Sequence, residues 1–368
     1  MIGIERLDRE ADRLRIEWAD GSISEHSWLW LRDHSHDPAT LHPDTRQRQL
    51  ATAEVDPSLT AAAITSTDVA VVIEWSDHDH PDSVLPLDFL AVHRSPDRLD
   101  DVYTERVLWD GTSILDEWPT VVYDEVIDDD DGVARWLDLV ARFGFCMVIG
   151  TPPSVEATER LARRVGYVRE TIFGGMWDFR ADLAKADTAY TNTELRPHTD
   201  GTYSLDAPGL QLLHCLAFDG TGGESTMVDG FRVAAQLRVA DPEAYEVLST
   251  VEVPGRYVGD GVDLRASRPV FRHGTDGMLE QVSFNNADRA PFTLPFDEMQ
   301  RFYDALRALE RRLDDSRLQW RRVNPPGEAM LFDNWRVLHG RLSYTGHRHL
   351  CGCYINREDY LSRRRLLA

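Results

Sequence analysis

Arg196-Pro197-His198-Thr199-Asp200-Gly201 forms the centre of a segment, residues 188–231, around which the rest of the chain is organised. Side chains on an extended strand alternate between its two sides, so His198 and Asp200 point to the same side and can reach one ion. The best second histidine is His339, which ends a strand-like run and precedes a glycine turn. Two histidines and one carboxylate with open positions are typical of non-haem Fe(II) oxygenases. A His-x-Asp motif alone is weak, because a lone histidine is more often a satisfied polar group, so the prediction depends on both segments together.

Composition narrows the class of protein. The chain has 368 residues and a formal net charge of −23, so we expect no nucleic-acid partner, because a phosphate backbone would be repelled. The four cysteines are too few and too scattered for a secreted disulfide framework, which favours a reducing cytoplasm. We find neither a signal-type apolar run nor a stretch of the length that a membrane span requires. We therefore expect a soluble cytoplasmic protein.

The first part of the chain is typical of a small β-rich domain, which we place at residues 1–96. Residues 14–30 alternate around an Asp-Gly turn, which predicts a hairpin, and residues 69–75 form another β-branched run. Residues 31–37 and 77–80 are rich in potential metal ligands. We favour polar surface loops over a structural zinc site, because neither segment supplies a thiolate.

The remainder, residues 97–368, mixes apolar strands with amphipathic helices. It begins with a linker, residues 97–123, that carries short helical pieces. The acidic run at residues 128–131 precedes a helix and is interpreted as capping rather than metal binding. We predict helices at 133–143, 154–165, 231–248 and 297–313, strands at 145–149, 209–216 and 225–229 and around residues 251, 270, 282, 330 and 354, and a turn at 220–223. Strands that carry the ligands and are bracketed by helices favour a mainly β fold with flanking helices, a double-stranded β-helix or jelly roll.

Several motifs in order resemble one enzyme family along the whole chain. They are His198-Thr199-Asp200, residues 208–215, Gly222-Gly223-Glu224-Ser225, residues 228–231, Phe284-Asn285-Asn286, residues 332–341 and Arg348-His349-Leu350, together with residues 28–33 near the N-terminus. This series is similar to the gamma-butyrobetaine hydroxylase and trimethyllysine hydroxylase group of the taurine dioxygenase-like, 2-oxoglutarate-dependent dioxygenases. A series in order is far more specific than any one motif.

The resemblance implies a catalytic set and its cofactors. His198, Asp200 and His339 would hold Fe(II), with 2-oxoglutarate as cosubstrate and O2 as oxidant. Arg348 would bind the distal carboxylate of 2-oxoglutarate, since a planar guanidinium suits a bidentate contact; Arg341 and Arg357 are its rivals. Thr226 falls at a second cofactor-binding position.

The resemblance also implies a substrate with a trimethylammonium group, which aromatic faces recognise. The cage positions fall on Phe173, Trp177, Tyr190 and Tyr354, although core packing is the alternative for such aromatic residues.

At several other positions this sequence differs from the family. Ser35, Asp37 and Thr40 stand where zinc-binding cysteines are typical, Gly201 replaces a tyrosine, and Asp187 replaces an asparagine of the butyrobetaine enzymes. Asn286 is retained, and Asn192, Tyr203 and Arg289 are candidates to bind a different anion.

We therefore expect an Fe(II)- and 2-oxoglutarate-dependent hydroxylase of a small quaternary-ammonium substrate, of the gamma-butyrobetaine or 2-trimethylaminoethylphosphonate type, that releases succinate and CO2. Three alternatives stay open: a dioxygenase acting on another small amine or acid, a jelly-roll binder without turnover, and a metal-dependent hydrolase. A degenerate binder would tend to lose ligands, whereas all four are present. A hydrolase would need a general base beside its metal. The oligomeric state is open, with a homodimer as one alternative.

Overall fold

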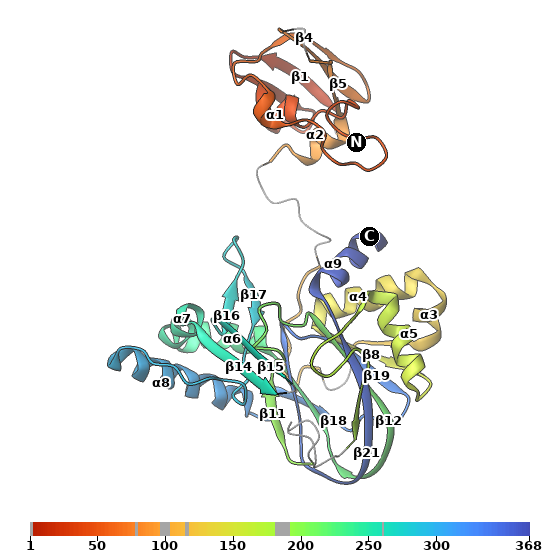
Figure 1. Ribbon diagram of the computed structural model, residues 1–368, viewed down its shortest axis with the longest axis vertical. Coiled ribbons are helices and arrows are strands. Elements are labelled where there is room, and N and C mark those ends of the chain that lie inside the picture. The colour runs from red at the N-terminus through yellow and green to blue at the C-terminus, as the bar shows by residue number, and fades with distance from the viewer. Residues whose placement is uncertain (1–2, 78–79, 96–103, 115–117, 181–191, 260) are drawn as a thin grey trace. The chain divides into compact units, whose positions relative to one another are not determined.

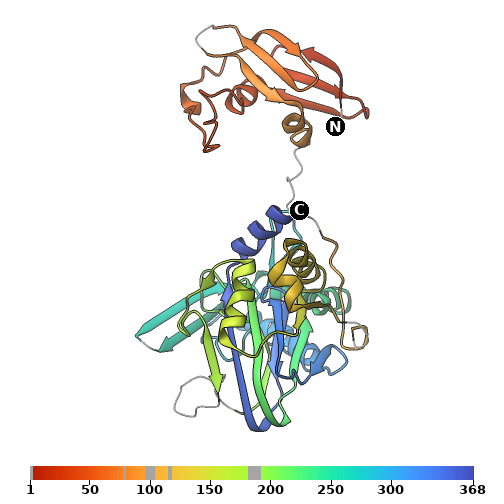
Figure 2. The same cartoon turned by 90° about the vertical axis from the view of Figure 1, so that its right-hand side faces the viewer.

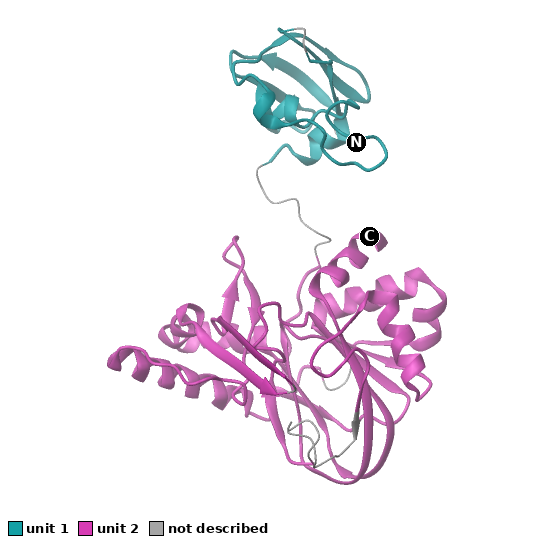
Figure 3. Cartoon of the chain, in the orientation of Figure 1, with its two compact units in different colours: residues 1–100 teal, residues 101–368 magenta. Residues whose placement is uncertain are grey.

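The computed structural model describes residues 3–77, 80–95, 104–114, 118–180, 192–259 and 261–368. The chain divides into two compact units, residues 1–100 and 101–368 (Figure 3). Each unit has its own hydrophobic core, so each is described by itself.

The described residues of the first unit form two three-stranded antiparallel sheets, two short α-helices and one 3-10 turn (Figure 1). The first sheet contains β1 (Ile4–Arg9), β2 (Arg13–Trp18) and β3 (Ile23–Ser27), and the second contains β4 (Ala61–Ser66), β5 (Ala70–Trp75) and β6 (Ser83–Pro86). The helices are α1 (Trp28–Asp33), α2 (Leu87–Val92) and the 3-10 turn η1 (Thr52–Glu54). The predicted hairpin is confirmed up to Ser27: β2 pairs with β3, and Gly21 has the positive φ of 80° that the turn requires. Residues 28–30, predicted as strand, instead begin α1, because the Ser27 side chain caps that helix.

A buried polar cluster lies in this unit at the positions where the resembling family has cysteines. The Arg32 guanidinium lies 3.3 Å from Asp37 Oδ2, and the Thr40 hydroxyl donates to the same oxygen at 2.7 Å. The Ser35 hydroxyl accepts a hydrogen bond from the backbone N–H of Val84 at 3.0 Å. These four side chains are at most 6% exposed. An ion pair with hydroxyl partners therefore occupies this part of the core.

The second unit is built from two facing β-sheets (Figures 1 and 2). The larger sheet has the order β10-β21-β12-β19-β8-β7, with β9 also paired to β21, and the smaller has the order β11-β20-β13-β18. Their strands are β7 (Thr120–Val122), β8 (Phe145–Ile149), β9 (Val168–Arg169), β10 (Trp177–Arg180), β11 (Leu195–His198), β12 (Leu210–Gly222), β13 (Ser225–Asp229), β18 (Gln319–Arg322), β19 (Glu328–Asp333), β20 (Val337–Arg341) and β21 (Tyr344–Ile355). Two hairpins stand outside these sheets: β14 (Val253–Gly259) with β15 (Val262–Arg268), and β16 (Phe271–His273) with β17 (Leu279–Val282).

Helices cover both sheets from outside. The larger sheet packs against α3 (Tyr123–Asp128), α4 (Asp130–Phe143), α5 (Val155–Val165) and α9 (Arg357–Leu367). The smaller sheet packs against α6 (Gly230–Ala240), α7 (Pro242–Thr250) and α8 (Phe296–Leu313) (Figure 1). Strand alternation explains this layering, because Cys146 and Val148 of β8 face the helices whereas Phe145 and Met147 face the inner core. The mainly β jelly-roll expectation is confirmed.

The structure corrects three details of the predicted elements. The helix predicted at 231–248 is two helices, because Asp241 caps the second one and Pro242 occupies its first position. The strand predicted at 209–216 continues as β12 to Gly222, because it pairs with β21 as far as Gly222 opposite Tyr344. The described part of the predicted linker, residues 104–114 and 118–122, contains no helix.

Candidate iron centre

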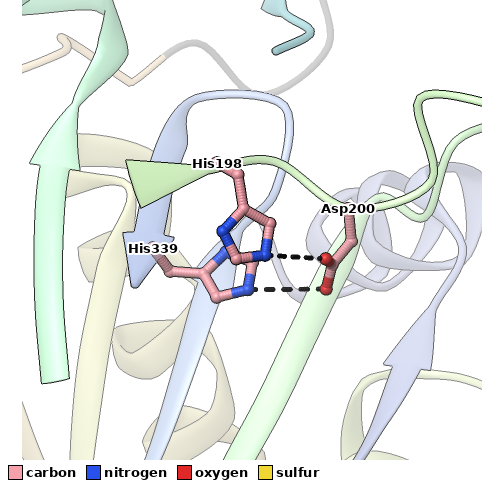
Figure 4. A group of neighbouring side chains, drawn as sticks. All are labelled: His198, Asp200 and His339. Carbon is pink, nitrogen blue, oxygen red and sulfur yellow. Dashed lines mark ion pairs between the residues drawn. The ribbon is translucent and has the colours of Figure 1, made fainter. Parts of the chain in front are cut away.

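Two histidines and one aspartate converge between the two sheets (Figure 4). His198 ends β11, and His339 lies opposite it on β20 in the antiparallel register. The Nε2 atoms of the two imidazoles lie 3.3 Å and 3.5 Å from different oxygens of the Asp200 carboxylate. Within the described ranges this is the one group of three metal-ligating side chains whose donor atoms all lie within 4.8 Å of one another. Two imidazoles and one carboxylate fit a divalent first-row metal with open positions.

The surroundings prepare His198 to bind a metal through Nε2. Its Nδ1 lies 2.8 Å from the carbonyl oxygen of Arg196, which can only accept a hydrogen bond, so Nδ1 carries the proton. Burial lowers the pKa of His198, but the hydrogen bond and the charge of Asp200 outweigh burial and raise it. Burial disfavours the charged form of Asp200, yet the two neighbouring imidazoles hold the pKa of that carboxyl well below its usual range.

Asp200 is fixed from two directions by other parts of the chain. The Asn334 amide, which is 1% exposed, accepts from the Asp200 backbone N–H at 2.8 Å and donates to the Asp200 carbonyl at 3.0 Å. The Tyr354 hydroxyl donates to Asp200 Oδ2 at 2.8 Å. Asn334 lies in the turn between β19 and β20, so the segment that leads to His339 also holds Asp200 in place.

A cavity of about 370 Å³ opens at these ligands. Its walls follow strand alternation, because Gln211 and Leu213 of β12 and Arg348, Leu350 and Tyr354 of β21 all face inward. Acidic side chains line the cavity beyond Asp200: Glu194, Asp288, Glu310 and Asp314. Its cationic lining residues are Arg196, Arg341 and Arg348, and Arg196 is paired with Asp314 at 3.0 Å.

One end of the cavity carries two arginines in contact with one aromatic ring. The guanidinium carbons of Arg341 and Arg348 lie 4.9 Å and 5.7 Å from the centre of the Tyr344 ring. Arg341 also donates to the Thr193 carbonyl at 2.6 Å, whereas Arg348 makes no ion pair with any described residue. Burial, followed by the charge of Arg341, lowers the pKa of Arg348 to about 10. Arg348 is thus a partly buried cation that lines the cavity and has no anionic partner among the described residues.

The side chains of Arg357 and Thr226, the other candidates for cofactor binding, differ in whether they are already bonded within the protein. Arg357 is bound to Asp333 at 2.6 Å and does not line the cavity, so it is not free to bind a ligand there. The Thr226 hydroxyl is buried and has no hydrogen-bond partner in the part of the chain that the structure describes. Thr226 pairs with Gly340, a lining residue, and a Cβ at Gly340 would lie 2.6 Å from that hydroxyl oxygen. An unsatisfied hydroxyl and an unpaired arginine beside the iron ligands fit an acidic cosubstrate.

The predicted substrate residues fall into three groups. Those that line the cavity are Phe173, Tyr203, Asn286 and Tyr354. Trp177, Asn192 and Arg289 do not line it in the described structure; Trp177 is buried behind Tyr354, with the ring centroids 5.6 Å apart, and Arg289 contacts Asn286. Asp187 and Tyr190 lie outside the described residues. The cage therefore stays a prediction.

Sequence reasoning missed several residues of the site. Gln211 and Tyr257 line the cavity, and the ring of Tyr257 lies 5.3 Å from that of Tyr203. Asn334 and the hydroxyl of Tyr354 hold Asp200. Asn334 lies within the motif at 332–341, from which the sequence predicts only His339 and Arg341 as site residues. Only the strand register reveals that Gln211 lies opposite Tyr354.

Comparisons with known proteins agree with this geometry. The model of the family "Taurine catabolism dioxygenase TauD, TfdA family" matches residues 110–354, and that of "Gamma-butyrobetaine hydroxylase-like, N-terminal" matches residues 5–91. Trimethyllysine dioxygenase from Meyerozyma guilliermondii is 32% identical over 99% of this chain and 96% of its own, and the mitochondrial trimethyllysine dioxygenase of Rattus norvegicus is 36% identical over 97% and 86%. Gamma-butyrobetaine dioxygenase from Pseudomonas sp. (strain AK-1) is 33% identical over 96% and 93%.

A solved structure supports the fold. A putative alpha-ketoglutarate-dependent taurine dioxygenase from Burkholderia xenovorans matches with a TM-score of 0.51 and 12% identity, over 69% of this chain and 92% of the other. Among the described residues, no helix is long and apolar enough to cross a membrane. The chain belongs to the taurine catabolism dioxygenase (TauD, TfdA) family, and within it to the group of the trimethyllysine and gamma-butyrobetaine dioxygenases.

Proposed function

We propose that this dioxygenase hydroxylates an unactivated C–H bond of a small quaternary-ammonium compound, with Fe(II), 2-oxoglutarate and O2. The observation that carries the proposal is the convergence of His198, Asp200 and His339 in a cavity that also holds Arg348, a cation without a carboxylate partner among the described residues. His198, Asp200 and His339 would hold the iron, and Arg348 with Thr226 would bind 2-oxoglutarate. When bound, these groups supply the oxidising chemistry, with succinate and CO2 as coproducts.

The protein's own residues orient the reactants. Asn334 and Tyr354 fix Asp200, so this ligand is oriented by the protein itself. Arg348, which lines the cavity, would provide a charge-assisted contact to one carboxylate of 2-oxoglutarate. The residues that line the cavity would then position the substrate carbon beside the metal.

The charge of the lining supports a cationic substrate. With 2-oxoglutarate at Arg348, the remaining lining holds four carboxylates beyond Asp200 against two guanidinium groups: Glu194, Asp288, Glu310 and Asp314 against Arg196 and Arg341. The relatives are named for trimethyllysine and gamma-butyrobetaine, which share the trimethylammonium group. Trimethyllysine carries one ammonium group more than gamma-butyrobetaine, so an excess of carboxylates favours trimethyllysine, and it is the first substrate to test. The four cysteines are all free and buried, which supports the cytoplasm as the expected location.

The test is succinate release by the iron-loaded protein with 2-oxoglutarate and a panel of trimethyllysine, gamma-butyrobetaine and 2-trimethylaminoethylphosphonate. We expect release to depend on Fe(II) and to be stimulated by at least one compound of the panel. Binding without any succinate would favour the jelly-roll binder. Stimulation by an amine or acid that lacks the quaternary group would favour the alternative dioxygenase.

The aromatic cage needs a separate test. A trimethylammonium substrate and its neutral tert-butyl analogue have the same shape, so they differ in the cation–π contribution, about 0.5–2 kcal/mol for each aromatic face. We expect Trp177→Ala to weaken binding of the cation more than binding of the neutral analogue. Equal losses for both ligands, with a lower melting temperature, would assign Trp177 to core packing.

A further inference from the structure

A buried glutamine lies beneath the iron ligands with an unsatisfied side chain. Gln211 is 3% exposed, lines the cavity, and has an Oε1 atom without a hydrogen-bond partner in the described ranges. Oε1 only accepts hydrogen bonds, so a carboxylate cannot satisfy it, and the atom of this amide that can bind an anion is the donor Nε2.

The neighbours of Gln211 place it at the iron end of the cavity. On the larger sheet it lies opposite Tyr354 on one side and opposite Phe332 on the other. The Tyr354 hydroxyl donates to Asp200, and the Phe332 ring lies 4.8 Å from that of His339. Both cross-strand neighbours of Gln211 thus contact iron ligands.

We infer that the Gln211 amide binds the carboxylate of 2-oxoglutarate that lies at the iron, by donating from Nε2. This inference rests on the proposed function, which puts the other carboxylate at Arg348. Arg348 and Gln211 belong to the same inward-facing wall, formed by β21 and β12. Tyr354, the other neutral donor on this wall, already donates to Asp200. An amide supplies two N–H donors without adding a charge to the metal site.

The alternative is that Gln211 only fills space. The two readings differ in ligand affinity. If Gln211 only fills space, Gln211→Leu should leave the affinity for 2-oxoglutarate unchanged, whereas if its amide binds the cosubstrate, that affinity should fall. A higher melting temperature is expected in either case, because a buried amide without partners destabilises the folded protein and an apolar side chain of similar size does not.

The chain offers a matched control. Gln281 on β17 is 2% exposed, also has an Oε1 atom without a partner in the described structure, and does not line the cavity. Gln281→Leu therefore makes the same chemical change away from the site. We expect it to leave 2-oxoglutarate binding unchanged.

The experiment measures 2-oxoglutarate binding to the Mn(II)-loaded protein by calorimetry, together with the melting temperature of the metal-free protein. For Gln211→Leu we expect binding about ten- to a hundredfold weaker, since a hydrogen bond to a charged group is lost. We also expect the melting temperature to rise by about 2 °C or more. Mn(II) affinity should stay within about twofold, because Gln211 is not a ligand.

The affinities for 2-oxoglutarate and Mn(II) together decide the role of Gln211. Unchanged 2-oxoglutarate affinity in Gln211→Leu, or an equal loss in Gln281→Leu, would overturn the inference. A fall in Mn(II) affinity with unchanged 2-oxoglutarate affinity would assign Gln211 to the metal itself and overturn it too. If the leucine variant fails to fold, Gln211→Met, which keeps the length of the side chain, replaces it in the same measurement of 2-oxoglutarate affinity. Failure of the wild-type protein to bind 2-oxoglutarate would instead count against the proposed function.

Discussion

The two units of this protein bury polar groups in different ways. In the first unit, Arg32, Asp37 and Thr40 bind one another, although Arg32 Nε has no partner in the described structure. In the second unit, Arg348 and Gln211 line a cavity, and Thr226 pairs with the lining residue Gly340. The Thr226 hydroxyl and Gln211 Oε1 have no hydrogen-bond partner among the described residues, and Arg348 makes no ion pair with them. Buried polar groups that satisfy one another stabilise a fold, whereas groups left unsatisfied beside a cavity are arranged for a ligand.

The histidines of the two units also differ in their arrangement. The first unit has His26, His34, His36 and His93 around the rings of Trp30 and Phe89, yet their donor atoms do not form a metal-binding group in the described residues. The second unit uses two histidines that lie opposite each other on paired strands. Ligand convergence, rather than the number of potential ligands, distinguishes the metal site.

The largest effect should follow from loss of an iron ligand. His198→Ala and His339→Ala should each reduce turnover by more than about a hundredfold, since even outer-shell changes at metal sites cost 10–100-fold. The measurement is bound iron together with succinate release. His34→Ala in the first unit is the control and should change neither. Near-normal turnover in both site variants would contradict the assignment of His198 and His339 as iron ligands.

The next largest effect should appear in the first unit as a loss of stability. Asp37→Ala leaves the buried Arg32 charge uncompensated, so the free energy of unfolding of this unit should fall by about 3–5 kcal/mol. Urea unfolding of the full chain gives the measurement. Glu25→Ala, which breaks an exposed pair with Arg13 in the same unit, should cost at most about 1 kcal/mol. Equal costs would contradict the structural role of the buried cluster.

A smaller effect is expected at the cosubstrate. Arg348→Met removes a charge-assisted contact worth about 1.5–3 kcal/mol, so the KM for 2-oxoglutarate should rise by about 10- to 150-fold. The KM for the quaternary substrate should change far less. Arg341→Met tests the rival, because Arg341 lies in the same cavity. If Arg341→Met alone raises the KM for 2-oxoglutarate, the role passes to Arg341.

The sequence predicts this fold and part of this site for identifiable reasons. Strand alternation and capping are local, so β8, β13, α5 and the hairpin of β2 with β3 lie where the pattern indicates. The iron ligands were found because they belong to two specific motifs. Gln211 and the bond from Tyr354 to Asp200 depend on the register of β12 with β21, which joins residues far apart in the chain. No local pattern contains that register.

The smallest predicted effect concerns pH and the first unit. His26 is 7% exposed, and its ring is stacked 4.5 Å from that of Trp30 on α1. Burial, followed by the charges of His93 and His34, which directly follow α2 and α1, lowers the pKa of His26 from 6.5 to about 4. The unfolded chain therefore takes up a proton below pH 6.5 that the folded unit does not. Stability is fully present above pH 6.5 and is lost as the pH falls toward 4, by about 2 kcal/mol at pH 5.

The experiment compares urea unfolding of the first unit at pH 7.5 and pH 5 in the full-length protein. His26→Phe keeps an aromatic ring against Trp30 but cannot take up a proton, so this variant should lose about 2 kcal/mol less than the wild type between the two pH values. His347→Gln, at an exposed position of the second unit, should behave like the wild type. If His26→Phe shows the full wild-type pH dependence, the acid sensitivity belongs to carboxylates such as Asp37, and the buried polar groups of this unit respond to pH through their anions.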